Sequence, residues 1–505
     1  MTKRVLSLLL VAVFCLTALV ACGPNEEDPQ TSETQPADSL PMNTQEQSQK
    51  LNDEDTLADY NFKGAEYKIL ARESTLYEFN HENDSGVDVI NNAVFLRNQQ
   101  VSERFNVNLR FEKVNGDWQV DSNNNPAGSA FHTKYSTIVQ SGWSEYSLVS
   151  AHFVMQSTIS VSGFCRDLTT LETVDMQKEW WSKPFYDACN IEGKFYVALG
   201  DIAHNLYEYM EVVFFNETMA ESYLKNAAGE PIDLYQLVED GNWTWEKMKE
   251  YILAVSYNAD DPEYGLLMNG HALKTMMMAM DLNVSEKNSD TGRWEFPTVA
   301  SEKITNRFDE VASFMTTTPN VSFDVQSATD EARLNPIFAA GDGLFYTQTL
   351  NQVSYLGENM ATGQSYGILP FPKYDEDQLD YLTTMRDSVT AVTVPKNVQD
   401  LEMVGVVTEA LCMYGYQNVR PVYLDTVVKG RYLTDSTLSK MLDMIREGVT
   451  ASFDMAYSAS LGYPYSMICD LTKDTTLNFT SRYAARQSTW SANAAKVYES
   501  LGVSS

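Results

Sequence analysis

Residues 86–114 read GVDVINNAVFLRNQQVSERFNVNLRFEKV, a stretch that changes its hydrophobic period once along its length. In its first part, apolar residues recur at the spacing of one helix face, at Ile90, Ala93, Val94, Val101 and Phe105. Residues 107–114 alternate between apolar and polar, which is typical of a strand with one buried face. YKILA, at residues 67–71, is a further strand candidate before the stretch. The sequence here therefore predicts a strand, a helix and a second strand.

The alternation of strand and helix continues along the chain. A helical pattern covers 130–141, and YSLVSA at 146–151 is again typical of a strand. Because strands that alternate with helices form parallel sheets, we expect an α/β lobe here. VVFFN at 212–216 opens a second series. Further strands are predicted at 196–199, 264–268, 344–347, 366–371 and 389–394, a hairpin turn at 290–294, and helices at 245–256, 301–314, 401–416, 437–448 and 483–501.

The N-terminus has the features of a secretory signal peptide. Lys3 and Arg4 precede a mostly apolar run at residues 5–19, which is short for a membrane-spanning helix and ends in small residues. Its last residues, Leu-Val-Ala-Cys at 19–22, resemble a bacterial lipobox. The resemblance implies cleavage before Cys22 and attachment of a diacylglycerol to its thiol. The alternative is an ordinary signal peptide with a chance cysteine.

After the signal peptide (1–21), residues 22–60 are predicted to form a lipidated, disordered tether. Residues 23–59 contain ten acidic side chains, one cation (Lys50) and no aromatic side chain. Such a stretch cannot bury enough apolar surface to offset the entropy of ordering it. The whole chain is also acidic, with a formal net charge of −33. This charge argues against nucleic acid and against anionic lipid head groups as partners.

Motifs of catalysis and of metal binding are weak in this chain. Residues 363–367 match GxSxG, but a strand is expected after Ser365, whereas a nucleophile elbow needs a helix there. The five histidines form no HExxH motif, and residues 258–263 lack the central glycine and the acid spacing of a calcium loop. We therefore predict no enzyme activity, no cofactor and no metal. The sequence does not choose among three complete pairings of the cysteines Cys165, Cys189, Cys412 and Cys469.

Seven stretches resemble the extracellular solute-binding proteins of ABC transporters, the class that contains the maltodextrin-binding protein. The resemblance is strongest to lipoproteins of this class from anaerobic Gram-positive bacteria. The stretches are GVDVINNAVFLRNQQVSERFNV (86–107), YSLVSAHF (146–153), EWWSKPFYDACNIEGKFYVALGDI (179–202), DLYQLVEDGNWTWEKM (233–248), NPIFAAGDGLFYTQ (335–348), YGILPFPKY (366–374) and VTVPKN (392–397). Their order and spacing, rather than any single stretch, carry the match.

The resemblance implies a two-lobed α/β fold of the periplasmic-binding-protein type (type II), with a ligand cleft between lobes that a multi-segment hinge joins. Chain crossings between the lobes would fall near 207–212, 385–390 and 432–437. Lobe one would comprise residues 61–208 and 386–435, and lobe two residues 209–385 and 436–505.

Candidate ligand-binding residues follow from the rule that sites in open α/β sheets lie at the carboxyl ends of strands. Aromatic faces and bidentate polar groups are the tools that bind sugars. The candidates are Arg72, Glu73, His152, Trp180, Trp181, Asp201, His204, Tyr207, Tyr346 and Arg386. Several have structural alternatives, because adjacent Trp180 and Trp181 cannot both face the cleft, and Arg72 and Arg386 would also suit ion pairs that stabilise the lobes.

The sequence thus predicts a lipid-anchored solute-binding protein that captures a saccharide or oligosaccharide for an ABC importer. Its partners would be the saccharide, the permease subunits and, through the Cys22 lipid only, the membrane, with no nucleic acid. We expect a monomer in the cell envelope, on the outer face of the cytoplasmic membrane. Two alternatives stay open: an envelope lipoprotein that binds or degrades glycans, whose paired carboxylates a sequence does not reveal, and a peptide-binding receptor of the same fold.

Overall fold

The computed structural model describes residues 55, 57–80, 88–117, 129–324, 331–424 and 436–503. Contacts divide the chain into two units, Met1–Asp55 and Thr56–Ser505. The sheets and helices below belong to the second unit. The expected signal peptide, Cys22, nearly all of the tether and most of the crossing at 432–437 lie outside the described residues.

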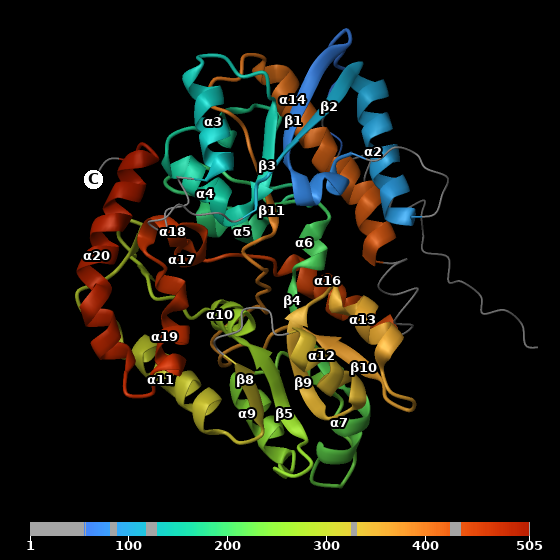
Figure 1. Ribbon diagram of the computed structural model, residues 1–505, viewed down its shortest axis with the longest axis vertical. Helices are drawn as coiled ribbons and strands as arrows, with labels where there is room; N and C mark the ends of the chain where they lie inside the picture. Colours follow the sequence, from blue (N-terminus) through green and yellow to red (C-terminus); the bar gives the residue numbers. More distant parts are fainter. Residues whose placement is uncertain are drawn as a thin grey trace, which may run out of the picture. The chain divides into compact units, whose positions relative to one another are not determined.

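The fold is built on two mixed β-sheets with helices packed around them (Figure 1). The first has the strand order β11–β3–β1–β2, and the second has the order β10–β4–β9–β5–β8, while β6 and β7 form a separate hairpin. The strands are β1 (Ala65–Arg72), β2 (Val107–Val114), β3 (Leu148–His152), β4 (Glu211–Asn216), β5 (Tyr264–Asn269), β6 (Glu286–Lys287), β7 (Trp294–Glu295), β8 (Val321–Asp324), β9 (Gly343–Thr349), β10 (Tyr366–Leu369) and β11 (Thr390–Thr393). The α/β fold class is confirmed.

Helices separate most of the strands and make up the C-terminal part of the chain. They are α2 (Val89–Phe105), α3 (Ala130–Gln140), α4 (Phe153–Val161), α5 (Lys183–Cys189), α6 (Asn205–Glu208), α7 (Glu217–Tyr223), α8 (Leu234–Glu239), α9 (Trp245–Ala254), α10 (Gly270–Ala279), α11 (Glu302–Thr317), α12 (Glu331–Ala340), α13 (Gln352–Asn359), α14 (Leu401–Tyr414), α16 (Ser436–Glu447), α17 (Phe453–Ala456), α18 (Ser458–Leu461), α19 (Met467–Lys473) and α20 (Phe479–Ser500). Short 3₁₀ turns lie at η1 (Glu73–Glu78), η3 (Leu168–Thr170) and η6 (Pro464–Ser466), and a π-helical turn, η4 (Gly415–Val419), follows α14.

The first sheet is built on parallel pairs, as the strand–helix alternation predicts. β1 pairs in parallel with β2 along all eight residues and with β3 over three, and β11 joins β3 antiparallel. Side chains of β1 pack into two different hydrophobic clusters, one on each face of the first sheet, because successive side chains of a strand point to opposite faces. The Tyr67 hydroxyl lies 2.7 Å from Thr408 Oγ1 of α14. On the other face, Leu70 packs with Phe131 and Tyr135 of α3.

The second sheet is mixed. β5 runs parallel to β8 and β9, whereas β4 runs antiparallel to β9 and β10. All seven residues of β9 are buried, since α12 and α7 contact it in addition to its neighbouring strands. The parallel strands β5 and β9 therefore share one carboxyl edge, at which Asn269 and Thr349 are the last residues.

Two segments of the chain connect the two sheets, one before β4 and one before β11. They lie antiparallel, with Met210 bridging Met385. The backbone N–H of Glu211 donates to the carbonyl of Thr384 (2.9 Å), and that of Arg386 donates to the carbonyl of Tyr209 (3.0 Å). We call residues 209–211 and 384–386 the crossing ribbon. Its position agrees with two of the expected crossings, although the division of the chain into lobes at these points stays a prediction.

The C-terminal helices contact elements around both sheets. α17 and α18 pack on α4, while α19 packs on α10 and α11. Near the end of the chain, the carbonyl of Leu501 accepts hydrogen bonds from Lys194 Nζ (3.3 Å) and from the Tyr196 hydroxyl (3.0 Å). The described part of the C-terminal segment that we expected in lobe two, residues 436–503, thus also contacts the helices that flank the first sheet.

One strand expected from the sequence does not form. Between Tyr196 and Leu199 the chain makes a single antiparallel bridge, from Ala198 to Val392 of β11. These four residues are all apolar and pack on the edge of the first sheet, but a single bridge does not make a strand.

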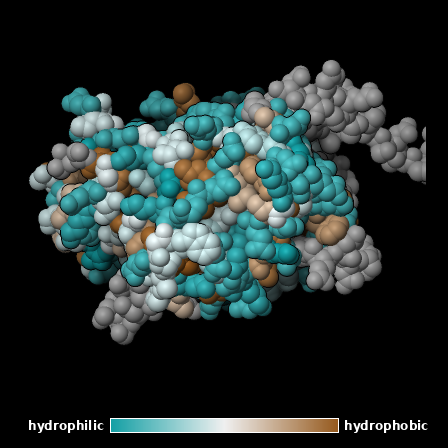
Figure 2. Space-filling view, turned by 90° about the horizontal axis from the view of Figure 1, so that it is seen from above, coloured by the Kyte–Doolittle hydropathy of each residue, from teal (hydrophilic) through white to brown (hydrophobic). Residues whose placement is uncertain are grey.

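Hydrophilic residues cover much of the face of the molecule that Figure 2 draws. On the face drawn in Figure 2, hydrophobic residues are scattered among hydrophilic ones, which is normal for a folded domain. None of the described helices is both long enough and apolar enough to cross a membrane. The large hydrophobic residues most exposed in the described ranges are Leu96, Trp143, Leu253, Tyr257, Val299 and Leu379.

Candidate ligand-binding site

Strand ends from both sheets are joined through charged side chains beside the crossing ribbon. His152 ends β3, and His271 lies in the first turn of α10, directly after β5. Both histidines approach the same carboxylate oxygen of Asp387, at 4.0 Å from His152 Nε2 and 3.6 Å from His271 Nε2. We define the crossing cluster as the charged and titratable residues Arg72, His152, Glu211, His271, Arg386 and Asp387.

The local fold fixes where His271 stands. The Asn269 side chain caps α10 by accepting the backbone N–H groups of His271 (2.9 Å) and Ala272 (2.8 Å). The ring of His271 then reaches Glu211 at the start of β4, with 3.3 Å between Nδ1 and Oε1. His271 therefore lies between two carboxylates, those of Glu211 and Asp387.

This position sets the protonation of the cluster. Burial alone lowers the pKa of His271, but its contacts with Asp387 and Glu211 outweigh burial and raise that pKa above its ordinary value. Burial likewise raises the pKa of Asp387, and its close contact with His271 reverses the shift and holds the pKa well below its usual range. For His152, burial dominates and lowers the pKa to about 4. The two histidines of the cluster are thus shifted in opposite directions: the carboxylates favour the charged form of His271, whereas burial favours the neutral form of His152.

Arg386 links the crossing ribbon to the second sheet. Its Nη2 atom donates to Glu331 Oε1 of α12 and to Gln348 Oε1 of β9, each at 2.5 Å. Its Nε atom lies 3.7 Å from Glu211 Oε1. Burial lowers the pKa of Arg386, and the charges of Glu211 and Glu331 outweigh burial and raise it.

Arg72, the last residue of β1, extends the cluster on the side of the first sheet. Its side chain is 3% exposed and donates to Thr75 Oγ1 (3.3 Å) and Thr390 Oγ1 (3.5 Å). Asp117 lies 3.6 Å from its Nη1 atom. Glu73, the next residue, does not join the cluster, because its exposed carboxylate pairs with Lys113 of β2 at 2.8 Å.

A second group of candidates lies on residues 201–208, beside α16. Asp201 is buried and accepts a hydrogen bond from Arg446 Nη2 at 3.1 Å. Tyr207 stacks on Tyr423, with ring centroids 5.8 Å apart, and its buried hydroxyl has no hydrogen-bond partner among the described residues. These side chains are enclosed in this structure, so they act on a ligand only if the chain around them moves.

His204 belongs to a separate buried network. Its Nε2 atom is 3.6 Å from Glu208 Oε1, and the Tyr77 hydroxyl donates to the other oxygen of Glu208 at 3.2 Å. Burial and the nearby charge of Glu78 raise the pKa of Glu208 to about 7.

Trp180 and Trp181 lie in the hydrophobic core, with exposed fractions of 1% and 2%. Their indole N–H groups donate to the two carboxylate oxygens of Glu409 on α14, each at 2.8 Å. We expected one ring of the pair to face the cleft, whereas here both turn toward the same buried acceptor. Both indole N–H groups can be buried, because the carboxylate of Glu409 accepts a hydrogen bond from each of them.

Tyr346 is also a core residue in this structure. It is fully buried in β9, between Phe214 and Phe338, and its hydroxyl donates to Asn335 Oδ1 at 2.6 Å. Gln348, two residues further along the same strand, donates its side-chain amide to the Tyr346 hydroxyl at 3.3 Å. Gln348, rather than Tyr346, is the residue of β9 that reaches Arg386.

Three residues of this site, Glu211, His271 and Gln348, were not predicted from the sequence. His271 follows a predicted strand by only a few residues, so the same carboxyl-end rule that selected His152 identifies it once it is applied to β5. Glu211 lies within a predicted crossing. Gln348 follows the predicted strand at 344–347.

The described residues outside the cluster offer little other chemistry. No group of three or more His, Cys, Asp or Glu side chains within the described ranges could hold a metal ion. Ser365 is followed by strand β10, so it does not stand on a nucleophile elbow. The four cysteines of the body, Cys165, Cys189, Cys412 and Cys469, are buried and free.

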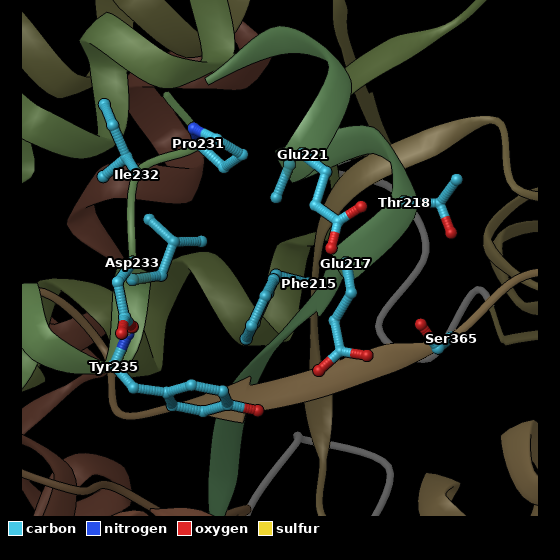
Figure 3. Close-up of a pocket in the computed structure, with 11 residues that line it drawn as sticks. Phe215, Glu217, Thr218, Glu221, Pro231, Ile232, Asp233, Tyr235 and Ser365 are labelled. Atoms are coloured by element: carbon cyan, nitrogen blue, oxygen red, sulfur yellow. The ribbon is translucent and has the colours of Figure 1, made fainter. Parts of the chain in front are cut away.

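A pocket of about 370 Å³ lies beside the second sheet, between β4, α7 and α8, and away from the crossing cluster. Figure 3 shows Glu217 and Glu221 of α7 on one side and Tyr235 of α8 on another. Phe215 of β4 lines it, four residues from Glu211, which corresponds to about 13 Å along a strand. The pocket and the crossing cluster are therefore separate sites.

Comparison with known proteins concerns the fold. No protein-family model matches the chain, and no curated protein is similar to it in sequence. Two similar solved structures are an ABC transporter solute-binding protein from Thermotoga lettingae bound with α-D-tagatose (12% identity, TM-score 0.47) and an ABC substrate-binding protein from Listeria monocytogenes in complex with cycloalternan (12% identity, TM-score 0.49). Each match covers 87% of this chain and 100% of the other.

A third similar structure is a de novo designed esterase, with 10% identity and a TM-score of 0.53. That match covers 86% of this chain and 99% of the other. At such an identity the likeness shows a shared fold alone.

Proposed function

We propose that this protein is a lipid-anchored extracellular solute-binding protein that captures a saccharide for an ABC importer. The observation that carries the proposal is the crossing cluster, in which the carboxyl ends of parallel strands from two sheets face each other beside a two-stranded ribbon. Ligands of open α/β sheets bind at such ends, and a ligand that touches both sheets favours their approach. The resemblance of the seven sequence stretches supports the same class of protein.

The chemistry of the cluster suits a polyhydroxylated ligand. Both carboxylate oxygens of Glu211, Nε of Arg386 and the ring nitrogens of His271 are buried and make no hydrogen bond in good geometry with the described residues. These groups take part in ion pairs, and each could still donate or accept a hydrogen bond. Vicinal hydroxyl groups offer a donor and an acceptor each, so they match such a mixed set.

The proposal is tested by a thermal-shift screen of mono- and oligosaccharides, followed by calorimetry with any saccharide that raises the melting temperature. A ligand at 100 times its Kd should stabilise the protein by about 2.7 kcal/mol. Arg386→Ala should weaken binding by roughly 2–4 kcal/mol, as expected for a desolvated arginine in a binding site. Gln348→Ala is a second variant in the same contact, and Arg110→Ala is the matched control, because Arg110 is an exposed arginine that pairs with Glu66.

Failure of every saccharide to shift the melting temperature would contradict saccharide capture, as would unchanged affinity in both Arg386→Ala and Gln348→Ala. The glycan-degrading alternative predicts that a saccharide is consumed over many turnovers, which chromatography of the incubated mixture detects. The peptide-receptor alternative predicts stabilisation by a peptide pool instead.

A further inference from the structure

Asp387 and His271 belong to different sheets. Asp387 precedes β11 by three residues, and the backbone N–H of Phe153, next to His152, donates to the carbonyl of Val389 at 2.9 Å. This bond ties the segment that carries Asp387 to the first sheet. His271 is tied to the second sheet by the Asn269 cap. Their contact therefore spans the crossing ribbon, and relative rotation of the two sheets would break it.

The surroundings of this contact are balanced in charge when His271 is protonated. Cations and anions then occur in equal number around it among the described residues. The charged and titratable groups that face the contact are Lys274 of α10, Glu211 of β4, His152 of β3, Arg72 of β1, Asp117 after β2, Glu331 of α12, Arg386 of the crossing ribbon, Tyr209 before β4, and Tyr463 and Tyr465 at η6. Tyr465 donates to Asp387 Oδ2 at 3.2 Å and lies under Lys274.

We propose that the His271–Asp387 contact, with His152 beside it, is a proton-controlled latch that holds the two sheets in the arrangement seen here over a limited range of pH. The latch rests on the proposed function in that it assumes two lobes that move about the crossing ribbon. It regulates the same site, because a ligand that contacts both sheets binds more tightly when the approach of the sheets is already favoured.

The opening of the latch at acid pH follows from the protonation of His152. Opening exposes this ring, which then takes a pKa near its ordinary 6.5, whereas the latched arrangement holds it at about 4. Protons therefore bind the open form more readily between these values, so acidification opens the latch. Between pH 7.5 and pH 4.5 the ratio of open to latched protein rises roughly 70-fold by this effect.

The alkaline side follows from His271, whose pKa is raised in the latched arrangement. A raised pKa contributes stabilisation that is fully present below the ordinary value of 6.5 and is lost as pH rises through the raised value. Deprotonation leaves Glu211 and Asp387 facing a neutral ring, so the contact across the ribbon weakens. The latched form is thus most populated near pH 6.5.

The test is solution scattering of the protein without any saccharide, from pH 4.5 to pH 8.5, with circular dichroism to verify folding at each pH. We expect the radius of gyration to be smallest near pH 6.5 and to increase on both sides. His271→Gln should remove the alkaline increase, and His152→Gln the acid one. Asp387→Asn should give the larger radius already at pH 6.5, since it removes the carboxylate that ties His271 to the first sheet and leaves only Glu211 of the second sheet facing the ring.

His132→Gln is the matched control, because His132 is a largely buried histidine of α3 that bonds Ser162 and lies outside the cluster. It should keep both increases. A radius that stays constant with pH in the folded protein would overturn the latch, as would a His271→Gln protein that keeps the alkaline increase or a His132→Gln protein that loses it. Protons are the only ligand in this measurement, so a negative saccharide screen does not affect it, and a constant radius leaves saccharide capture untouched.

Discussion

Glu409 offers the sharpest test of the placement of the two tryptophans. It lies in the middle of α14, is 2% exposed, and accepts the indole N–H groups of Trp180 and Trp181 at 2.8 Å each. Burial raises its pKa to about 7, although both indole hydrogen bonds act in the opposite direction. Glu409→Gln is the informative substitution, because glutamine is neutral at every pH and has one acceptor oxygen where the carboxylate has two.

The two consequences of this substitution depend differently on pH. Glutamine leaves one buried indole N–H unsatisfied, which costs about 1–3 kcal/mol at any pH. In the wild-type protein, the folded state binds the Glu409 proton more tightly than the unfolded chain, so stability falls as pH rises from 4.5 through 7. At 1.36 kcal/mol per tenfold change in the proton-binding constant, that loss is about 0.8 kcal/mol at pH 5 and about 3.3 kcal/mol at pH 8.

Urea denaturation at pH 5 and at pH 8 measures the difference. The variant should have a lower free energy of unfolding than the wild type at pH 5. Between pH 5 and pH 8, the difference in unfolding free energy between variant and wild type should change by about 2.5 kcal/mol in favour of the variant. Glu402→Gln, on the exposed first turn of the same helix, should show no such movement. A stability difference that is the same at both pH values would refute the buried, shared carboxylate, and with it the assignment of both tryptophans to the core.

Two further predictions concern the anchor and the second sheet. Cys22→Ala should move the protein from the membrane fraction to the medium or the soluble envelope, and unchanged retention in the membrane fraction would contradict the lipobox interpretation. Tyr346→Phe removes a buried hydroxyl that bonds Asn335 and Gln348. It should lower the free energy of unfolding by about 1–2 kcal/mol in urea denaturation, whereas an unchanged midpoint would mean that the hydroxyl is not enclosed as described.

The sequence predicted the elements of the fold well where a periodic pattern was long. β2 spans the residues 107–114 that alternate, and the helix expected at 401–416 is found at Leu401–Tyr414. Such patterns are local, because each residue shows which face of its own element is buried. The strand that was expected at 196–199 and does not form shows the limit, since a run of four apolar residues also fits a buried segment that makes one bridge to a distant strand.

The candidate site was predictable only in part. The carboxyl-end rule selected Arg72 and His152, which are in the crossing cluster, because it depends only on where strands end. It could not show that Trp180 and Trp181 share an acceptor on α14, since Glu409 is more than 200 residues away in the sequence. Whether an aromatic side chain lines a cleft or is buried in the core depends on such distant partners. A local sequence pattern does not show them.

The pairing of β11 with β3 has a consequence for how the chain acquires its fold. Thr390 lies opposite His152, 238 residues later in the sequence, and the whole second sheet is encoded between them. At 5–20 residues per second, a ribosome needs about 12–50 s to make that interval. During this time the edge of β3 that β11 will cover has no strand to pair with. Newly made chains should therefore depend on chaperones during this interval, and cutting the chain anywhere between the two strands should leave an N-terminal fragment prone to aggregation.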